Sequence, residues 1–247
     1  MRRLTFGGKN RFPLWSSDGQ RVAFQSDREG DLGIFWQPAD GTGTAERLTK
    51  PESGTSHVPE SWSPKGEQFL FSATKGSSVS LWTFSLRDKK ATAFDAVQSS
   101  TPTTAVFSPD GRWLAYTSTE RGTETVYVQP FPATGAKYQI LSKAGDAPHH
   151  PLWSPDGKEL FYIPRAGGFE VVSINTQPTF TFGNPVPVPR AFGVAANTTP
   201  RTFDITPDGK IVAVVTSGQA QSGAPATPQI QVVLNWFEEL KQRVPTK

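Results

Sequence analysis

Trp153-Ser154-Pro155-Asp156-Gly157 is one of five copies of a pentapeptide pattern that recurs along the chain. The closing glycines of successive copies lie 47, 45, 46 and 52 residues apart. A period of roughly 40 to 50 residues is typical of β-propellers, in which each repeat forms one blade. The pattern therefore predicts a five-bladed β-propeller. The other four copies are Trp15-Ser16-Ser17-Asp18-Gly19, Trp62-Ser63-Pro64-Lys65-Gly66, Phe107-Ser108-Pro109-Asp110-Gly111 and Ile205-Thr206-Pro207-Asp208-Gly209.

Each pentapeptide has the residues of a tight hairpin corner. The aromatic or aliphatic residue ends a strand, Ser-Pro begins the turn, and Asp-Gly supplies the position with positive φ. An apolar or alternating strand follows each corner, as in Arg21-Val22-Ala23-Phe24, and further strands follow a second turn. We therefore expect four-stranded antiparallel blades. We also expect four corner aromatics to be buried between neighbouring blades, namely Trp15, Trp62, Phe107 and Trp153.

The length of 247 residues is compatible with a single all-β domain over residues 1–247. The fifth repeat lacks an outer strand, because after Leu234 the chain continues into residues 235–241, which read as a short C-terminal helix. Arg2-Arg3-Leu4-Thr5 resembles the outer strand of the first repeat, so we expect it to pair with residues 230–233 and close the ring. The predicted blades span residues 10–50, 57–95, 101–142, 148–190 and 198–235, with the closing strand at 2–6.

These corners, together with Ser26-Asp27-Arg28-Glu29-Gly30 and the Leu-Thr pairs that end blades, resemble the TolB-type β-propeller repeat over nearly the whole chain. The resemblance implies a functionally broad family, which includes periplasmic partners of lipoproteins and the propellers of prolyl-oligopeptidase-like peptidases. TolB itself has six blades and a further α/β domain, which five repeats do not supply. Residues 235–241 resemble the end of propellers that follow bacterial eukaryotic-like Ser/Thr kinase domains, but no His-Arg-Asp or Asp-Phe-Gly motif occurs.

Composition excludes several classes of function. The chain has no cysteine, which rules out disulfides, thiolate catalysis and cysteine-based zinc sites. The net charge of +3 comes from scattered Lys and Arg residues, so we expect no nucleic-acid partner. No segment approaches the roughly 20 apolar residues of a membrane helix. The N-terminus lacks the apolar stretch of a signal peptide, and the resemblance implies the bacterial cytoplasm or periplasm.

Five residues are candidates for a functional site at the mouth of the central channel, where propellers commonly bind ligands. His57 and His149 each stand two residues before a proline that precedes a corner, and Arg11 stands at the same distance before Pro13. His150 is adjacent to His149, and Arg201 stands just after Pro200. Equivalent positions of a repeat form a ring about the propeller axis, so we expect these side chains to converge.

The convergence would permit three kinds of chemistry. His57, His149 and His150 are candidates for catalysis as general bases, and His57 and His149 for holding one divalent metal ion as a cofactor. Arg11 and Arg201 are candidates for binding a ligand. The alternative is that all five are ordinary polar residues that solvate the rim of the channel.

No complete catalytic motif is present, so the sequence favours a binding module whose partner is a protein or a small-molecule ligand at the channel mouth. The alternative from a different class is a small-molecule hydrolase, acting as an esterase, lactonase or phosphotriesterase through the channel-mouth histidines. A third hypothesis is a structural set of blades belonging to a longer kinase-linked protein.

Overall fold

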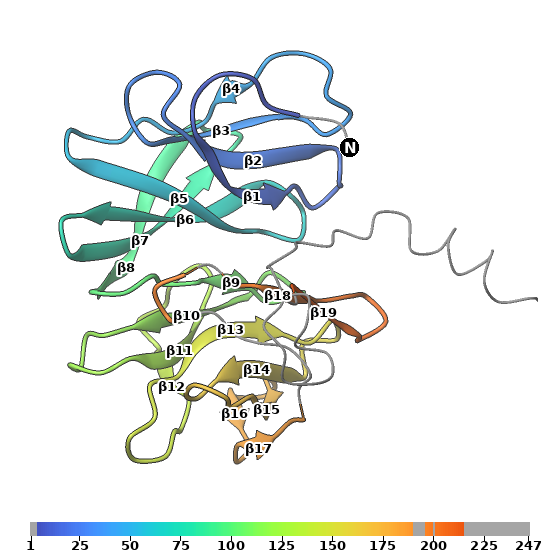
Figure 1. The fold of residues 1–247 in the computed structure, drawn as a ribbon. Helices are drawn as coiled ribbons and strands as arrows, with labels where there is room; N and C mark the ends of the chain where they lie inside the picture. The colour runs from blue at the N-terminus through green and yellow to red at the C-terminus, as the bar shows by residue number, and fades with distance from the viewer. Residues whose placement is uncertain (1–3, 190–195, 200, 215–247) are drawn as a thin grey trace, which may run out of the picture.

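The computed structural model describes residues 4–189, 196–199 and 201–214, and within these ranges the chain is all-β, without a helix. The strands form five consecutive antiparallel sheets, which we number I to V (Figure 1). Sheet I comprises β1 (Asn10–Trp15), β2 (Arg21–Ser26), β3 (Gly33–Pro38) and β4 (Glu46–Arg47). Sheet II comprises β5 (Thr55–Trp62), β6 (Gln68–Lys75), β7 (Ser78–Ser85) and β8 (Lys90–Ser99).

Sheet III comprises β9 (Val106–Phe107), β10 (Trp113–Ser118), β11 (Thr125–Pro130) and β12 (Tyr138–Gln139). Sheet IV comprises β13 (His149–Trp153), β14 (Glu159–Ile163), β15 (Glu170–Asn175), β16 (Thr181–Phe182) and β17 (Val186–Pro187). Sheet V comprises β18 (Phe203–Ile205) and β19 (Ile211–Ala213). In sheets I to IV the strands pair in the order in which they follow along the chain, with β17 also pairing with β15. This succession of antiparallel meanders is that of a β-propeller.

The predicted hairpin corners are confirmed. In the corner that leads from β9 to β10, the hydroxyl of Ser108 donates to the carboxylate of Asp110 over 2.6 Å, and Gly111 has a φ of 71°. The backbone N–H of Gly111 donates to the carbonyl of Ser108 over 2.9 Å, which closes the turn. The other corners place their glycines at φ values between 67° and 80°. Asp-Gly thus serves the turn chemistry that its sequence predicts.

Four hydrophobic clusters join consecutive sheets within the described residues. One cluster joins sheets I and II, a second joins II and III, a third joins III and IV, and the smallest joins IV and V. Three corner aromatics lie in these contacts, each against the preceding sheet. Trp62, for example, stacks on Trp36 of sheet I with ring centroids 5.9 Å apart. Trp62, Phe107 and Trp153 are 4–8% exposed, so their predicted burial is confirmed.

The same prediction is wrong for Trp15, which is 58% exposed. Each corner aromatic packs on the sheet that precedes its own, and Trp15 belongs to the first sheet of the chain. Its partner around a ring would be sheet V, of which the structure describes two strands. Burial of a corner aromatic therefore depends on a neighbouring sheet, and the pentapeptide alone does not supply one.

We call the first strand of each sheet its inner strand, and the inner strands of three sheets carry a β-bulge. The register shifts between Arg11 and Leu14 in β1, between Pro59 and Ser61 in β5, and between His149 and Leu152 in β13. Bulges bend a strand and re-aim its side chains, and they occur often beside binding sites. The inner strands are therefore the part of the fold that positions a central site.

Some predicted elements lie outside the described residues. They are the pairing of Arg2–Thr5 with residues 230–233, and the helix at 235–241 on which the resemblance to kinase-linked propellers rests. Within the described part of the chain, no helix has the length and hydropathy needed to cross a membrane.

Candidate functional site

A cavity of about 690 Å³, which we call the central cavity, lies beside the inner strands β1, β5 and β18. Its walls come from β1, β5 and β6, from the segment that precedes β9, and from β18 and β19, so residues of sheets I, II and V and the approach to sheet III face one space. Most of the wall is apolar or carries hydroxyl groups, and three charged residues interrupt it. The lining residues are Phe12, Pro13, Leu14, Val58, Pro59, Glu60, Ser72, Thr74, Pro102, Thr104, Thr198, Arg201, Thr202, Phe203, Asp204, Val212, Ala213 and Val214.

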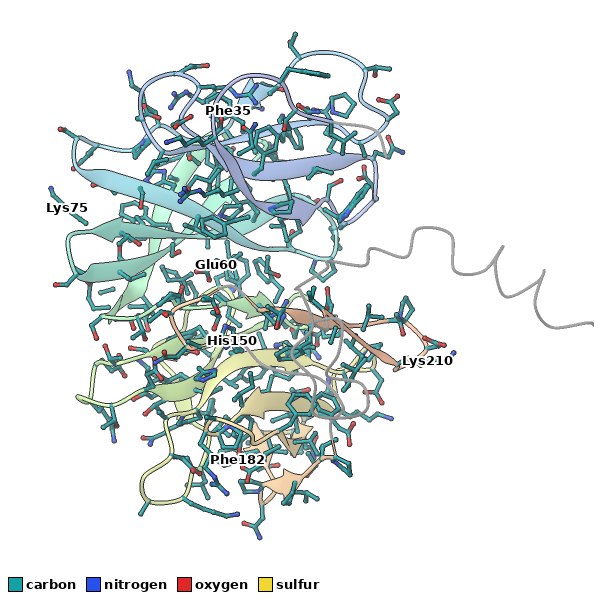
Figure 2. The ribbon with its side chains drawn as sticks, in the orientation of Figure 1. Phe35, Glu60, Lys75, His150, Phe182 and Lys210 are labelled. Carbon is teal, nitrogen blue, oxygen red and sulfur yellow. The ribbon has the colours of Figure 1, made fainter. Side chains whose placement is uncertain are left out.

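Glu60 stands at the bulge of β5, and its carboxylate is held by the segment that precedes β9. The hydroxyl of Thr103 donates to Oε1 over 2.6 Å, and the backbone N–H of Ala105 donates to Oε2 over 2.5 Å. Figure 2 shows Glu60 between the upper sheets and the lower sheets of the view. The carboxylate therefore links sheet II to the approach to sheet III at the wall of the cavity.

Arg201 also lies in the cavity wall, two residues before β18. Its Nε donates to the carbonyl of Phe203 and its Nη1 donates to the carbonyl of Pro151 in β13, each over 3.1 Å. The second bond ties the start of sheet V to the inner strand of sheet IV. Arg201 thus lies in the cavity wall, and its predicted role in binding a ligand stays a prediction.

Burial shifts the pKa of both Glu60 and Arg201 toward the uncharged form. Burial raises the pKa of Glu60, and the hydrogen bonds from Thr103 and Ala105 offset this only in part. Burial lowers the pKa of Arg201, while the carboxylates of Asp204 and Glu60 act in the opposite direction. Glu60 and Arg201 thus interact through space, but no ion pair within 4.0 Å joins them among the described side chains.

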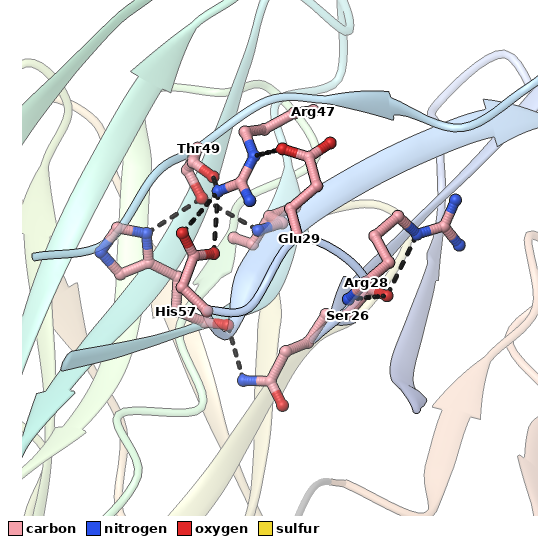
Figure 3. Close-up of polar contacts among 9 residues, drawn as sticks. Ser26, Arg28, Glu29, Arg47, Thr49 and His57 are labelled. Carbon is pink, nitrogen blue, oxygen red and sulfur yellow. Dashed lines mark hydrogen bonds and ion pairs between the residues drawn. The ribbon is translucent and has the colours of Figure 1, made fainter. Parts of the chain in front are cut away.

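His57 does not line the central cavity; it lies between sheets I and II (Figure 3). Its Nδ1 is 2.9 Å from the hydroxyl of Thr49, and its ring contacts Phe71 with centroids 4.8 Å apart. Its backbone N–H donates to Leu32, and its carbonyl accepts from the side chain of Gln25. Burial lowers the pKa of His57 to about 4. These contacts are those of a residue that holds two sheets together.

The expected equivalence of His57 with Arg11 and His149 is wrong, because the proline that follows each of them does not stand at one distance from the corner aromatic. Arg11 and His149 each stand four residues before their corner aromatic. Trp15 is paired with Val22 and Arg11 with Gln25, and in the same spacing Trp153 is paired with Leu160 and His149 with Ile163. In β5 this position belongs to Val58, which is paired with Ser72. His57 is one residue further away and so points to the other face of the strand. Val58, accordingly, lines the cavity.

His149 and His150 form a buried pair. Their Nδ1 atoms are 2.7 Å apart, and Nε2 of His150 is 2.7 Å from the carbonyl of Thr199. His150 has a φ of 55°, which is unusual for a residue with a side chain and reflects the bulge in β13. Burial lowers the pKa of both rings, that of His149 to about 4. Neither ring lines the central cavity.

The five predicted residues therefore do not converge on one point. Arg201 lines the cavity, Arg11 is exposed beside it, and the three histidines are buried in contacts between sheets. Within the described ranges, no group of three or more His, Asp or Glu side chains is arranged to hold a metal ion, and metal binding by His57 and His149 stays a prediction.

Sequence reasoning missed Glu60, although a signal was present. Counting from the corners places Pro13, Glu60, Ala105, Pro151 and Phe203 at one repeat position. Glu60 is the charged member of that set. A charged residue at a position that is apolar in the other repeats indicates a functional group.

Comparisons with known proteins agree with this architecture. The chain is 31% identical over 150 residues to the uncharacterized peptidase YuxL of Bacillus subtilis, a match that covers 61% of this chain and 21% of that protein. It is 26% identical over 168 residues to the Tol-Pal system protein TolB of Francisella tularensis, covering 66% of this chain and 38% of that protein. The chain thus spans well under half the length of these relatives.

Two solved structures share the fold. The crystal structure of TolB from Acinetobacter baumannii superposes with a TM-score of 0.65 at 20% identity, covering 85% of this chain and 50% of that one. An oligogalacturonate lyase from Vibrio parahaemolyticus superposes with a TM-score of 0.63 at 9% identity, covering 85% and 60%. Residues 51–181 match the family model of the TolB β-propeller domain. More than half of the chain lies in that match, and the chain belongs to the TolB β-propeller domain family.

Proposed function

We propose that this protein is a binding module that takes its ligand into the central cavity. The observation that carries the proposal is the cavity itself, of about 690 Å³, with apolar walls and a few fixed polar groups. Sites for small ligands are typically concave, mostly apolar and 300–1,000 Å³ in volume, with a small number of polar groups that set orientation. The relationship to TolB, named as a component of the Tol-Pal system, also supports a binding role.

Hydrogen bonds hold two charged side chains of the cavity wall in place, which supports a preformed site. Glu60 is held from sheet II by two hydrogen bonds to the segment before β9, and Arg201 is held by two backbone carbonyls. A site whose polar groups are already fixed loses less conformational entropy when a ligand binds. This supports binding without a large rearrangement of the inner strands.

A hydrolase receives less support. The alternative required His57, His149 and His150 at the channel mouth, and all three are buried in contacts between sheets. Peptidase activity, which the name of the Bacillus subtilis relative mentions, belongs to a protein of which this chain spans about a fifth.

The binding role is tested by filling the cavity. Val58→Trp places a large side chain into the cavity, whereas Thr92→Trp adds the same side chain at an exposed position of the outer strand β8. The probes are indole, 1-naphthalenemethanol and 1-naphthaleneacetate, followed by ligand-observed NMR. We expect at least one probe to bind the parent and the Thr92→Trp variant but not Val58→Trp. Equal binding to all three proteins, or to none, would refute the proposal.

We infer further that the five sheets are the blades of one closed ring in a single domain over residues 1–247. The four hydrophobic clusters that join consecutive sheets support this inference. Closure through Arg2–Thr5 and residues 230–233 stays a prediction. Deleting residues 1–6 should lower the melting temperature of the whole protein, because it leaves a strand edge unpaired. An unchanged melting temperature would reject closure by this strand.

A further inference from the structure

Arg201 is a charged group with unused hydrogen-bonding capacity in the cavity wall. A guanidinium carries five N–H donors, and two of those of Arg201 are engaged, by the carbonyls of Phe203 and Pro151. Both acceptors are neutral. Among the described residues, no carboxylate lies within 4.0 Å of this guanidinium. Arg201 therefore has donors and a positive charge to offer to a ligand.

The two carboxyl groups on the same wall do not neutralise Arg201 by direct contact. The oxygens of Glu60 accept from Thr103 and Ala105, and burial favours its uncharged form. One oxygen of Asp204 accepts from the backbone N–H of Ile205. Glu60 and Asp204 act on the pKa of Arg201 electrostatically, from further away than the 4.0 Å of an ion pair. Arg201 is partly buried, and a partly desolvated cation without an ion-pair partner favours an anionic ligand at this point.

We propose that Arg201 receives the carboxylate of a small organic acid whose apolar body fills the central cavity. This inference rests on the proposed binding function and names the class of ligand. A planar guanidinium matches a carboxylate with two parallel hydrogen bonds, which fixes orientation as well as charge. Phe12, Leu14 and Val58 supply the apolar surface for the body of the acid. The negative Asp204 on the same wall disfavours a second anionic group, so the ligand is a monocarboxylate.

Cavity size favours a small molecule over a macromolecular partner. A volume of about 690 Å³ lies within the range of sites that enclose most of a small ligand. The C-terminal residue of a peptide would offer the same carboxylate, and it serves below as a competing occupant.

The test compares two probes that differ in charge. The full chain is titrated with 1-naphthaleneacetate and with 1-naphthaleneacetamide by calorimetry at low salt and pH 7.5. We expect the acid to bind about 10- to 100-fold more tightly than the amide, the range that hydrogen bonds to charged groups provide. Arg201→Gln should remove this preference. Because Arg201 also holds Pro151 and Phe203, the melting temperature of this variant is measured alongside.

A second pair of variants leaves those backbone contacts intact. Val212 lines the cavity and is 57% exposed, so it tolerates a polar side chain. Val212→Asp adds a negative charge that should weaken binding of the acid at least 10-fold and leave the amide unchanged. Val212→Asn has the same shape without the charge, and it should affect the acid no more than the amide.

The outcomes separate this inference from the proposed function. If acid and amide bind equally and Val58→Trp abolishes both, the carboxylate inference is refuted while binding in the cavity is upheld. If neither compound binds the parent, both proposals are refuted. If a peptide that ends in Phe with a free carboxylate binds more tightly than the acid and displaces it, the assignment to a small molecule is refuted.

Discussion

Nδ1 of His149 and Nδ1 of His150 lie 2.7 Å apart, so the two rings share one hydrogen bond. The carbonyl of Thr199 only accepts, and it lies 2.7 Å from Nε2 of His150, so that nitrogen carries the proton. In a neutral ring, Nδ1 of His150 is then the acceptor and Nδ1 of His149 the donor. The arrangement fixes both tautomers and links the inner strand of sheet IV to the segment that leads into sheet V.

This pair makes stability depend on pH. Burial, with a smaller contribution from His150, lowers the pKa of His149 to about 4, whereas an unfolded histidine titrates near 6.5. Between these values the unfolded chain binds more protons, so the free energy of unfolding decreases as the pH falls from 6.5 to 4. His149→Gln keeps a donor but does not titrate. By calorimetry, the melting temperature of both proteins should fall between pH 7.5 and pH 4.5. The fall in His149→Gln should be smaller than that in the parent by at least about 2 °C. Identical drops would show that His149 titrates normally in the folded protein.

The corner aromatics should differ in their contribution to stability. Trp62 and Trp153 are buried against the preceding sheet, so replacing either by Ala should lower the free energy of unfolding by about 3 to 5 kcal/mol. Trp15 is 58% exposed, and Trp15→Ala should cost less than about 1.5 kcal/mol. Urea denaturation of the three variants measures these values. A cost for Trp15→Ala equal to that of Trp62→Ala would mean that Trp15 is buried against a neighbouring sheet.

Glu60 should stabilise the contact between sheet II and the segment before β9. Glu60→Gln replaces one oxygen by an NH2 group, which cannot accept a hydrogen bond as an oxygen of the protonated or the ionised carboxyl can, so it should cost about 1 to 3 kcal/mol. Because burial raises the pKa of Glu60, the folded protein retains its proton at a pH where the unfolded chain has lost it. The advantage of the parent over the variant should be largest below about pH 4.5 and shrink as the pH rises. Urea denaturation at pH 4 and pH 7 measures this difference. A larger advantage at pH 7 would show that hydrogen bonding outweighs burial and lowers this pKa.

The repeated corner was predictable because its chemistry is local. Ser108, Asp110 and Gly111 form their turn from contacts within a few residues, and the period of the pentapeptide then places the sheets in order. The burial of Trp62 followed from that order, whereas the exposure of Trp15 depends on which sheet lies beside it.

The site was less predictable because the prolines of the inner strands do not keep one place in the repeat. The bulge falls at the same place relative to the corner in β1, β5 and β13, but the proline stands three residues before Trp62 and two before Trp153. That difference turns His57 toward sheet I and Val58 into the cavity. Arg201, which the sequence places just after Pro200, lies in the cavity wall, and its role in binding a ligand stays a prediction.

In the proposed binding mode, a ligand occupies the cavity between the inner strands with its anionic group at Arg201. The decisive measurement is a ¹⁵N NMR titration of the full chain with 1-naphthaleneacetate, including the Nη–H signals of Arg201, because its Nε–H is already bonded to the carbonyl of Phe203. We expect the largest shifts at these Nη–H signals and at the backbone amides of Phe12, Val58 and Val212. Shifts confined to the groove between sheets III and IV, which Trp113 and Trp153 line, or Nη–H signals of Arg201 that do not move, would rule this binding mode out.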